Sequence, residues 1–144
     1  MKIFTIGFTK KSAEEFFTLL KNPDIHRLVD IRLNNVSQLA GFTKRDDLRY
    51  FLKAICNIDY VHAPLLAPTK TMLDAYKKNG GDWASYEAAF LNLIRERQIE
   101  RSTSKELLAN ACLLCSEAKP DHCHRRLVAE YLEEKWGNVT VTHL

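Results

Sequence analysis

Two short motifs in the last third of the chain concentrate reactive side chains. Cys115 and Glu117 are followed at close spacing by Cys123, His124 and Arg125. This segment therefore holds thiols that can act as nucleophiles, a carboxylate and an imidazole that can transfer protons, and a fixed positive charge that can hold an anion. The sequence predicts that the functional centre of the protein lies in residues 115–125.

The expected secondary structure explains why these side chains would meet. Residues 111–115 form a continuous apolar run that predicts a buried strand. Pro120 is expected to open the next helix with Asp121 as its N-cap, which places residues 122–124 in the first turn. Free backbone N–H groups and the positive end of the helix favour an anion there. A cysteine in that position tends toward the thiolate, and a neighbouring histidine or arginine strengthens the tendency.

The ends of three other predicted strands add candidate ligand-binding residues. These are Gly7 and Thr9 after the first strand, Asp30 and Arg32 at the end of the second, and His62 at the end of the third. In an open α/β sheet, ligands bind beyond the carboxyl ends of the strands. Arg32 is expected to clamp a carboxylate or phosphate in bidentate fashion, Thr9 to hydrogen-bond it, and Gly7 to let the backbone approach.

Strand patterns alternate with helical patterns along nearly the whole chain. Strands are expected at residues 2–7, 27–31, 59–62, 111–115 and 139–143, and helices after Ser12 with Glu15, after Thr43 with Asp46, over 70–79, after Asp82 and after Pro120. This alternation predicts an α/β fold with one domain over residues 1–144 and a mainly parallel sheet flanked by helices on both faces.

Composition narrows the class of protein. The 144 residues are 46% hydrophobic and 27% charged, which is typical of a globular chain and argues against disorder or a fibrous architecture. No stretch approaches the roughly 18–20 apolar residues of a membrane span, and the N-terminus resembles a strand rather than a signal peptide. A cytoplasmic location is therefore expected, where the four cysteines would be thiols or metal ligands rather than disulfides.

The cysteines and charges also permit other interpretations. Cys112 and Cys115 share a predicted strand, where an offset of three points them to opposite faces, so Cys112 is expected to be a buried apolar residue. Cys56 is expected to pack in the core. Cys115, Cys123 and a histidine could instead hold a transition metal such as zinc, although their spacing is not that of a zinc finger.

Arginine pairing is the structural alternative to ligand binding. Glu117 and Arg125 could form an internal salt bridge that ties the helix to the sheet. Arg32 could likewise pair with Asp30 or Glu117 and only order the loops. The aromatic stripe of Trp83, Tyr86 and Phe90 has helical spacing and is expected to be core packing, and His62 is expected to be a hydrogen-bonded, partly buried histidine.

The same residues resemble a known family. Thr5-Ile6-Gly7 with Thr9, Leu28 to Arg32, Cys115-x-Glu117 with Cys123-His124-Arg125, and the final Val141-x-His143 are similar to motifs of domain of unknown function family 488. The resemblance extends over essentially the whole chain. It supports the fold and the position of the site, and it implies no particular reaction.

The leading hypothesis is a small enzyme or ligand-binding protein for an anionic molecule, such as a phosphorylated or nucleotide-like one. Cys123 or Cys115 would be the nucleophile, Glu117 and His124 would move protons, and Arg32 with Arg125 would hold negative charge. The metal-binding protein is the first alternative. A nucleic-acid-binding or regulatory module is the second, and it rests on the net charge of +3 and scattered basic residues. The sequence does not identify a cofactor.

Overall fold

A five-stranded sheet forms the centre of the computed structural model, which describes residues 1–36, 41–78, 80–117 and 119–144. The strands are β1 (Lys2–Gly7), β2 (Arg27–Asp30), β3 (Asp59–His62), β4 (Ala111–Cys115) and β5 (Thr140–His143). Their order is β3-β2-β4-β1-β5, and every described pairing is parallel. The register places Gly7 beside Cys115 and Asp30 beside Leu114, so the chemistry-bearing strand ends lie at one edge of the sheet.

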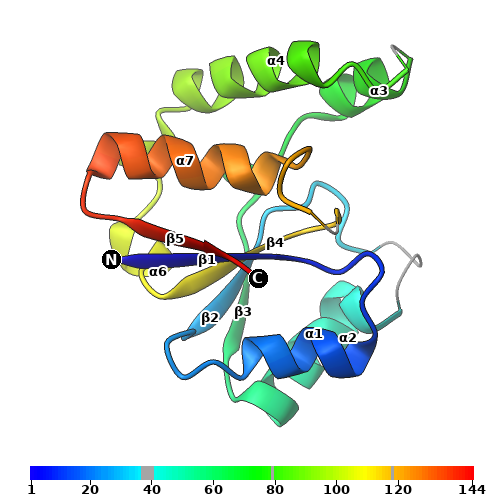
Figure 1. The fold of residues 1–144 in the computed structure, drawn as a ribbon, viewed down its shortest axis with the longest axis vertical. Coiled ribbons are helices and arrows are strands. Elements are labelled where there is room, and N and C mark those ends of the chain that lie inside the picture. Colours follow the sequence, from blue (N-terminus) through cyan, green and yellow to red (C-terminus); the bar gives the residue numbers. More distant parts are fainter. Residues whose placement is uncertain (37–40, 79, 118) are drawn as a thin grey trace.

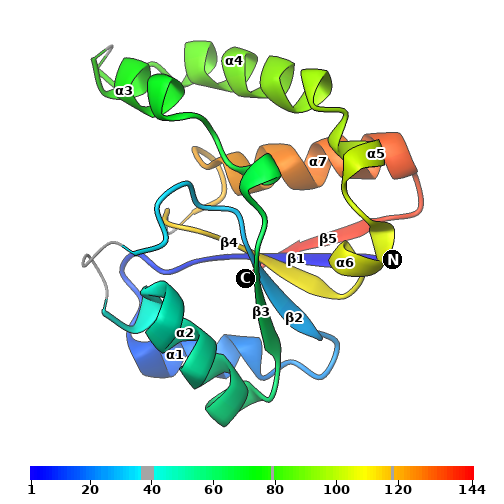
Figure 2. The same ribbon diagram turned by 180° about the vertical axis from the view of Figure 1, so that it is seen from behind.

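Helical segments connect the strands. The longer helices are α1 (Ala13–Leu20), α2 (Arg45–Phe51), α3 (Lys70–Lys78), α4 (Trp83–Glu96) and α7 (His124–Trp136). The shorter segments are the 3-10 helices η1 (Gly41–Thr43) and η3 (Pro64–Leu66), the π-helix η2 (Leu52–Cys56), and α5 (Ile99–Ser102) and α6 (Lys105–Leu108). Figures 1 and 2 show α1 and α2 on one face of the sheet and α7 with α4 on the other. The predicted α/β fold with a parallel sheet and helices on both faces is confirmed.

Alternation along the strands divides the core into two layers. Phe4, Leu28 and Cys112 pack with α1 and α2, whereas their neighbours Ile3 and Val29 pack with α4 and α7. Successive strand residues point to opposite faces, so Cys115 shares the α7 face with Ala111 and Leu113. The prediction that Cys112 and Cys115 face apart is confirmed. Cys112 is fully buried in the core layer that packs against α1 and α2.

Helix α1 starts as the sequence predicts, because the Ser12 hydroxyl accepts the backbone N–H of Glu15 at 3.1 Å. Helix α2 does not. It begins at Arg45 with Lys44 as N-cap, and Thr43 instead closes η1. The Thr43 carbonyl accepts a hydrogen bond from Arg32, which holds it in the tertiary structure rather than at a helix start.

The start of α7 corrects a prediction that matters for the site. Cys123, not Asp121, is the N-cap, and it has extended backbone angles. Residues 120–123 form a turn in which the Cys123 N–H donates to the Pro120 carbonyl, and the helix begins only at His124. His122 and Cys123 therefore lie outside the helix. Among the residues that the structure describes, no helix is both long and apolar enough to cross a membrane.

Candidate active site

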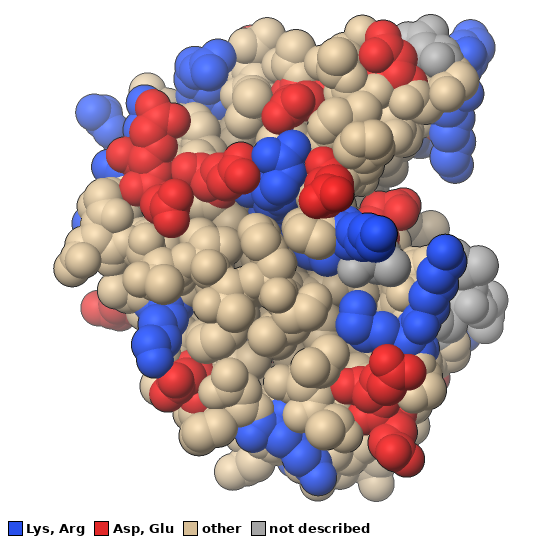
Figure 3. All heavy atoms as spheres, viewed as in Figure 1, with Lys and Arg blue, Asp and Glu red and all other residues tan. Residues whose placement is uncertain are grey.

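A pocket of about 310 Å³ opens at the carboxyl edge of the sheet. The chain leaves β2 toward α2 on one face and leaves β4 toward α7 on the other (Figure 1), so a crevice forms between the two strand ends. Residues of α3 and α4 supply one wall of the pocket, and residues 32–34 and 115–117 supply the other. In Figure 3 the surface is hollowed at the right, below the layer of α3 and α4.

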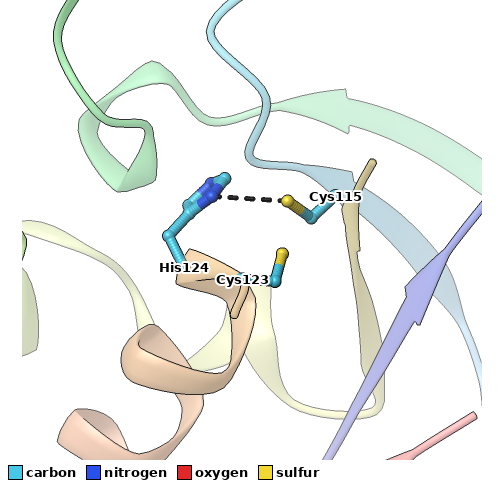
Figure 4. A group of neighbouring side chains, drawn as sticks. All are labelled: Cys115, Cys123 and His124. Carbon is cyan, nitrogen blue, oxygen red and sulfur yellow. Dashed lines mark hydrogen bonds between the residues drawn. The ribbon is translucent and has the colours of Figure 1, made fainter. Parts of the chain in front are cut away.

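Cys115, the last residue of β4, lies in this wall beside His124, the first residue of α7 (Figure 4). Cys115 Sγ is 3.3 Å from His124 Nδ1. The other ring nitrogen, Nε2, is 2.7 Å from the carbonyl oxygen of Ile31. A carbonyl only accepts hydrogen bonds, so Nε2 must carry a proton, and in the neutral ring Nδ1 then presents its lone pair to the thiol. A nucleophile, a base and a group that orients the base are thus aligned.

Cys123 completes a compact cluster. Its sulfur points toward that of Cys115 in Figure 4, and the two sulfurs and a His124 ring nitrogen all lie within 4.8 Å of one another. Cys115 and Cys123 are only 5% and 2% exposed, and both line the pocket. The structure therefore brings together Cys115, Cys123 and His124 from the predicted site.

The surroundings distinguish the two thiols. Burial acts to raise the pKa of Cys115, but a hydrogen bond from Cys123, the backbone N–H groups of Ser116 and Glu117, and the charge of Arg125 together lower it below the ordinary thiol value. Burial, the hydrogen bond with Cys115 and the charge on Cys115 raise the pKa of Cys123 well above that value, with His124 opposing. In this coupled pair, the surroundings therefore favour ionisation of Cys115 over that of Cys123.

Arg125 supplies positive charge from beneath the site. Its side chain is fully buried, Nη1 donates to the backbone carbonyl of Glu117, and Nη1 lies 3.9 Å from Cys123 Sγ. The alternative in the sequence analysis was a salt bridge between Glu117 and Arg125, whereas the contact seen here is a hydrogen bond to the Glu117 backbone carbonyl. Glu117 itself is exposed and lines the pocket.

Gly7 has a structural reason to be glycine. A Cβ atom at this position would overlap the carbonyl oxygen of Glu117 and Nη1 of Arg125. The close approach that the sequence predicted for a ligand is therefore made by the protein's own 115–117 segment. Thr9 is held next to it, because its backbone N–H donates to the Ser116 carbonyl at 3.0 Å.

Arg32 pairs with Asp30, which was the alternative to ligand binding. Arg32 Nε and Nη2 donate to the two carboxylate oxygens at 2.9 and 2.8 Å, and Nη2 also reaches the Thr43 carbonyl at 2.7 Å. Asp30 is fully buried and also accepts the Tyr60 hydroxyl at 2.6 Å. The bidentate face of Arg32 is thus occupied by Asp30, so the expected bidentate clamp on a ligand is not available while this pair is intact. Part of the residue still borders the pocket.

His62 supports the same loop. Its Nε2 lies 3.0 Å from the Arg32 carbonyl, and the residue is partly buried, as the sequence predicted. Together with the Asp30–Arg32 pair, this contact fixes residues 31–32. The Ile31 carbonyl that orients His124 belongs to this fixed segment, so Asp30, Arg32 and His62 act on the site through the backbone.

The sequence interpretation missed the aromatic wall of the pocket. Tyr76 of α3 and Trp83 and Tyr86 of α4 line it. Trp83 stacks on His122, with ring centroids 5.1 Å apart and planes at 15°. Tyr86 and Phe90 belong to the core, as expected, and Tyr86 also lines the pocket. Helical spacing alone could not reveal this, because the same stripe faces the core at one end and the pocket at the other.

The three clustered donor atoms could also hold a metal ion. Two thiolates and an imidazole are ligands that zinc prefers, and three protein ligands leave the fourth position open in catalytic zinc sites. The hydrogen bond from His124 Nε2 to a backbone carbonyl is the outer-shell contact usual for a metal-bound histidine. The donor set therefore fits zinc as well as it fits thiol chemistry.

Comparison with protein families places the chain. A family model described as "Domain of unknown function DUF488" matches residues 12–132. The chain belongs to this DUF488 family. The match includes the Cys115–Arg125 segment and the motif at the end of β2, while the motifs at residues 5–9 and 141–143 lie outside it. No curated protein and no solved structure matches this DUF488 chain.

Proposed function

We propose that this DUF488 protein is a cysteine-dependent enzyme that acts on a small anionic molecule, with Cys115 as the nucleophile. One observation carries the proposal. A thiol in the pocket wall lies 3.3 Å from the lone-pair nitrogen of a histidine whose other nitrogen is fixed by a backbone carbonyl. This arrangement provides the activated sulfur and the oriented base that covalent catalysis needs.

The remaining residues take defined parts in this mechanism. His124 Nδ1 accepts the Cys115 proton as the sulfur attacks, and it returns the proton to the leaving group. The Cys123 thiol and the backbone N–H groups of Ser116 and Glu117 stabilise the sulfur anion. Glu117, exposed at the pocket, is a second proton carrier. The free cysteines favour a reducing compartment such as the cytoplasm as the setting.

Two cationic groups support an anionic substrate. The buried charge of Arg125 lies beneath the sulfurs, and Lys77 reaches the pocket from α3. Such charges stabilise negative charge that is present on a substrate or develops during the reaction. The aromatic wall of Tyr76, Trp83 and Tyr86 would hold the uncharged part of the molecule.

Site-resolved alkylation tests the nucleophile. At pH 7, iodoacetamide is expected to modify Cys115 ahead of Cys112, Cys56 and Cys123, as measured by peptide mass spectrometry. Replacing His124 with Asn is expected to slow Cys115 alkylation by about tenfold or more, because less thiolate is present without the base. Cys56→Ser is the matched control, since Cys56 lies by α1 on the other side of the sheet, and it should leave the rate unchanged.

Competition by anions tests the substrate class in the same assay. Phosphate or a nucleoside monophosphate is expected to slow Cys115 alkylation and leave Cys56 alkylation unaffected. If Cys115 is alkylated fast but anions do not slow the reaction, the proposed anionic substrate is wrong, whereas the role of Cys115 as nucleophile stands. Alkylation of Cys115 no faster than that of Cys112 would overturn the proposal as a whole.

Metal binding is a second candidate function, favoured by the clustering of Cys115, Cys123 and His124 within 4.8 Å. Elemental analysis of untagged protein, purified without chelator, tests it. A zinc enzyme is expected to retain a stoichiometric amount of zinc, which Cys123→Ser would reduce. Substoichiometric zinc in the wild type, even after incubation with zinc and buffer exchange, would reject this function.

Surface charge adds no support for a nucleic-acid partner. On the face shown in Figure 3, Lys and Arg side chains of the described residues are interspersed with Asp and Glu. Nucleic-acid-binding domains more often gather basic residues into a stripe. On this face, surface charge therefore adds nothing to the basis of that alternative, which is the net charge of +3 and the scattered basic residues.

A further inference from the structure

The closeness of the two sulfurs in the cluster allows chemistry beyond the activation of Cys115. Cys115 and Cys123 lie within 4.8 Å of one another in one pocket wall, and both are free thiols. A disulfide needs an S–S separation of about 2.05 Å. Cys123 is the N-cap of α7 and has extended backbone angles, so it precedes the first helical residue, His124.

We propose that Cys115 and Cys123 are a redox pair, in which a peroxide oxidises Cys115 and Cys123 captures the product as an intramolecular disulfide. The inference rests on the proposed role of Cys115 as nucleophile. It assigns Cys123 a separate task, that of the resolving thiol. The disulfide would silence the nucleophile reversibly and protect it from irreversible oxidation.

The reaction balances in three steps. Cys115 sulfur attacks one peroxide oxygen, the O–O bond breaks, and the thiol proton, carried by His124, passes to the leaving oxygen to give an alcohol or water. Cys115 is then a sulfenic acid. Cys123 sulfur attacks the Cys115 sulfur, the S–O bond breaks, and water leaves with the Cys123 proton. An external dithiol reduces the disulfide and is itself oxidised to a disulfide.

The other cysteines are poorly placed for this chemistry. Cys112 is fully buried on the opposite face of the sheet, and Cys56 lies by α1, where its sulfur is 3.5 Å from the Phe17 carbonyl. By contrast, Arg125 Nη1 lies 3.9 Å from Cys123 Sγ, and the pocket gives a small peroxide a path to both sulfurs. The position of the pair therefore predicts one specific disulfide.

Mass spectrometry of the whole native chain tests the pair. Reduced protein is treated with equimolar hydrogen peroxide, blocked with N-ethylmaleimide and digested with trypsin without reductant. Cys112, Cys115 and Cys123 fall in one tryptic peptide, residues 106–125, because the Lys119–Pro120 bond resists trypsin. We expect the mass of this peptide to be two hydrogens lower than that of the form with free Cys115 and Cys123. Cys112 should be alkylated, and the fragment spectrum should contain no backbone cleavages between the linked residues 115 and 123. Dithiothreitol should restore the reduced mass.

Variants separate this inference from the proposed function. In Cys123→Ser, dimedone is expected to trap a sulfenic acid on Cys115, whereas Cys56→Ser, the matched control, should form the disulfide as the wild type does. Fast alkylation of wild-type Cys115 with oxidation that stops at the sulfenic or sulfinic acid would overturn the redox pair and leave the nucleophile standing. A Cys112–Cys115 link would also overturn it. A Cys115 inert to both iodoacetamide and peroxide would overturn both proposals.

Discussion

Replacing Asp30 with alanine is expected to lower the free energy of unfolding by about 3–5 kcal/mol, because removing one partner of a buried ion pair leaves the other charge uncompensated. Asp30 is fully buried, and Arg32 is 5% exposed. The carboxylate also accepts the Tyr60 hydroxyl at 2.6 Å, so that donor loses its partner as well. Urea denaturation measures the change.

An exposed pair of the same kind provides the control. Lys53 Nζ and Asp59 Oδ1 are 3.2 Å apart, with side chains 63% and 71% exposed. Asp59→Ala is expected to change the free energy of unfolding by no more than about 1 kcal/mol. A loss in Asp30→Ala no larger than in Asp59→Ala would show that the buried pair does not hold residues 30–32 in place.

Replacing Gly7 with alanine is expected to damage both stability and the site. The new Cβ would overlap the Glu117 carbonyl oxygen, which belongs to the backbone and can move only with the 115–117 segment. Overpacking of this kind costs typically about 1–3 kcal/mol, sometimes more. Because Cys115 lies in the displaced segment, its alkylation by iodoacetamide should slow together with the loss of stability in urea.

Gly41→Ala is the matched substitution, since a Cβ there meets nothing within 4 Å. It should leave both the free energy of unfolding and the Cys115 alkylation rate close to wild type. If Gly7→Ala behaves like Gly41→Ala, the close packing of Gly7 against the Glu117 carbonyl does not position the site.

Local sequence patterns were sufficient to predict much of the fold. Alternating strands and helices indicated a parallel sheet, and the positions of Cys115 and Asp30 at strand ends placed them at one edge. Strand periodicity also separated Cys112 from Cys115 correctly. These features depend on residues that are neighbours along the chain, so they can be predicted from a single sequence.

Features that depend on distant residues could not be predicted. Asp121 is a good N-cap residue by type, but the turn closed by the Cys123 N–H and the Pro120 carbonyl moves the helix start to His124. The bond from His124 to the Ile31 carbonyl joins residues 93 positions apart. Whether Arg32 meets Asp30 or a ligand depends on loop geometry that no spacing rule gives.

The pH dependence of Cys115 alkylation in the wild-type protein tests the central claim most directly. Only the thiolate reacts, so the rate rises with pH through the pKa of the sulfur. Because its neighbours lower the pKa of Cys115 despite burial, the midpoint is expected below the usual value of about 8.5. A midpoint at or above that value, resolved for Cys115 by mass spectrometry, would contradict the assignment of Cys115 as an activated nucleophile.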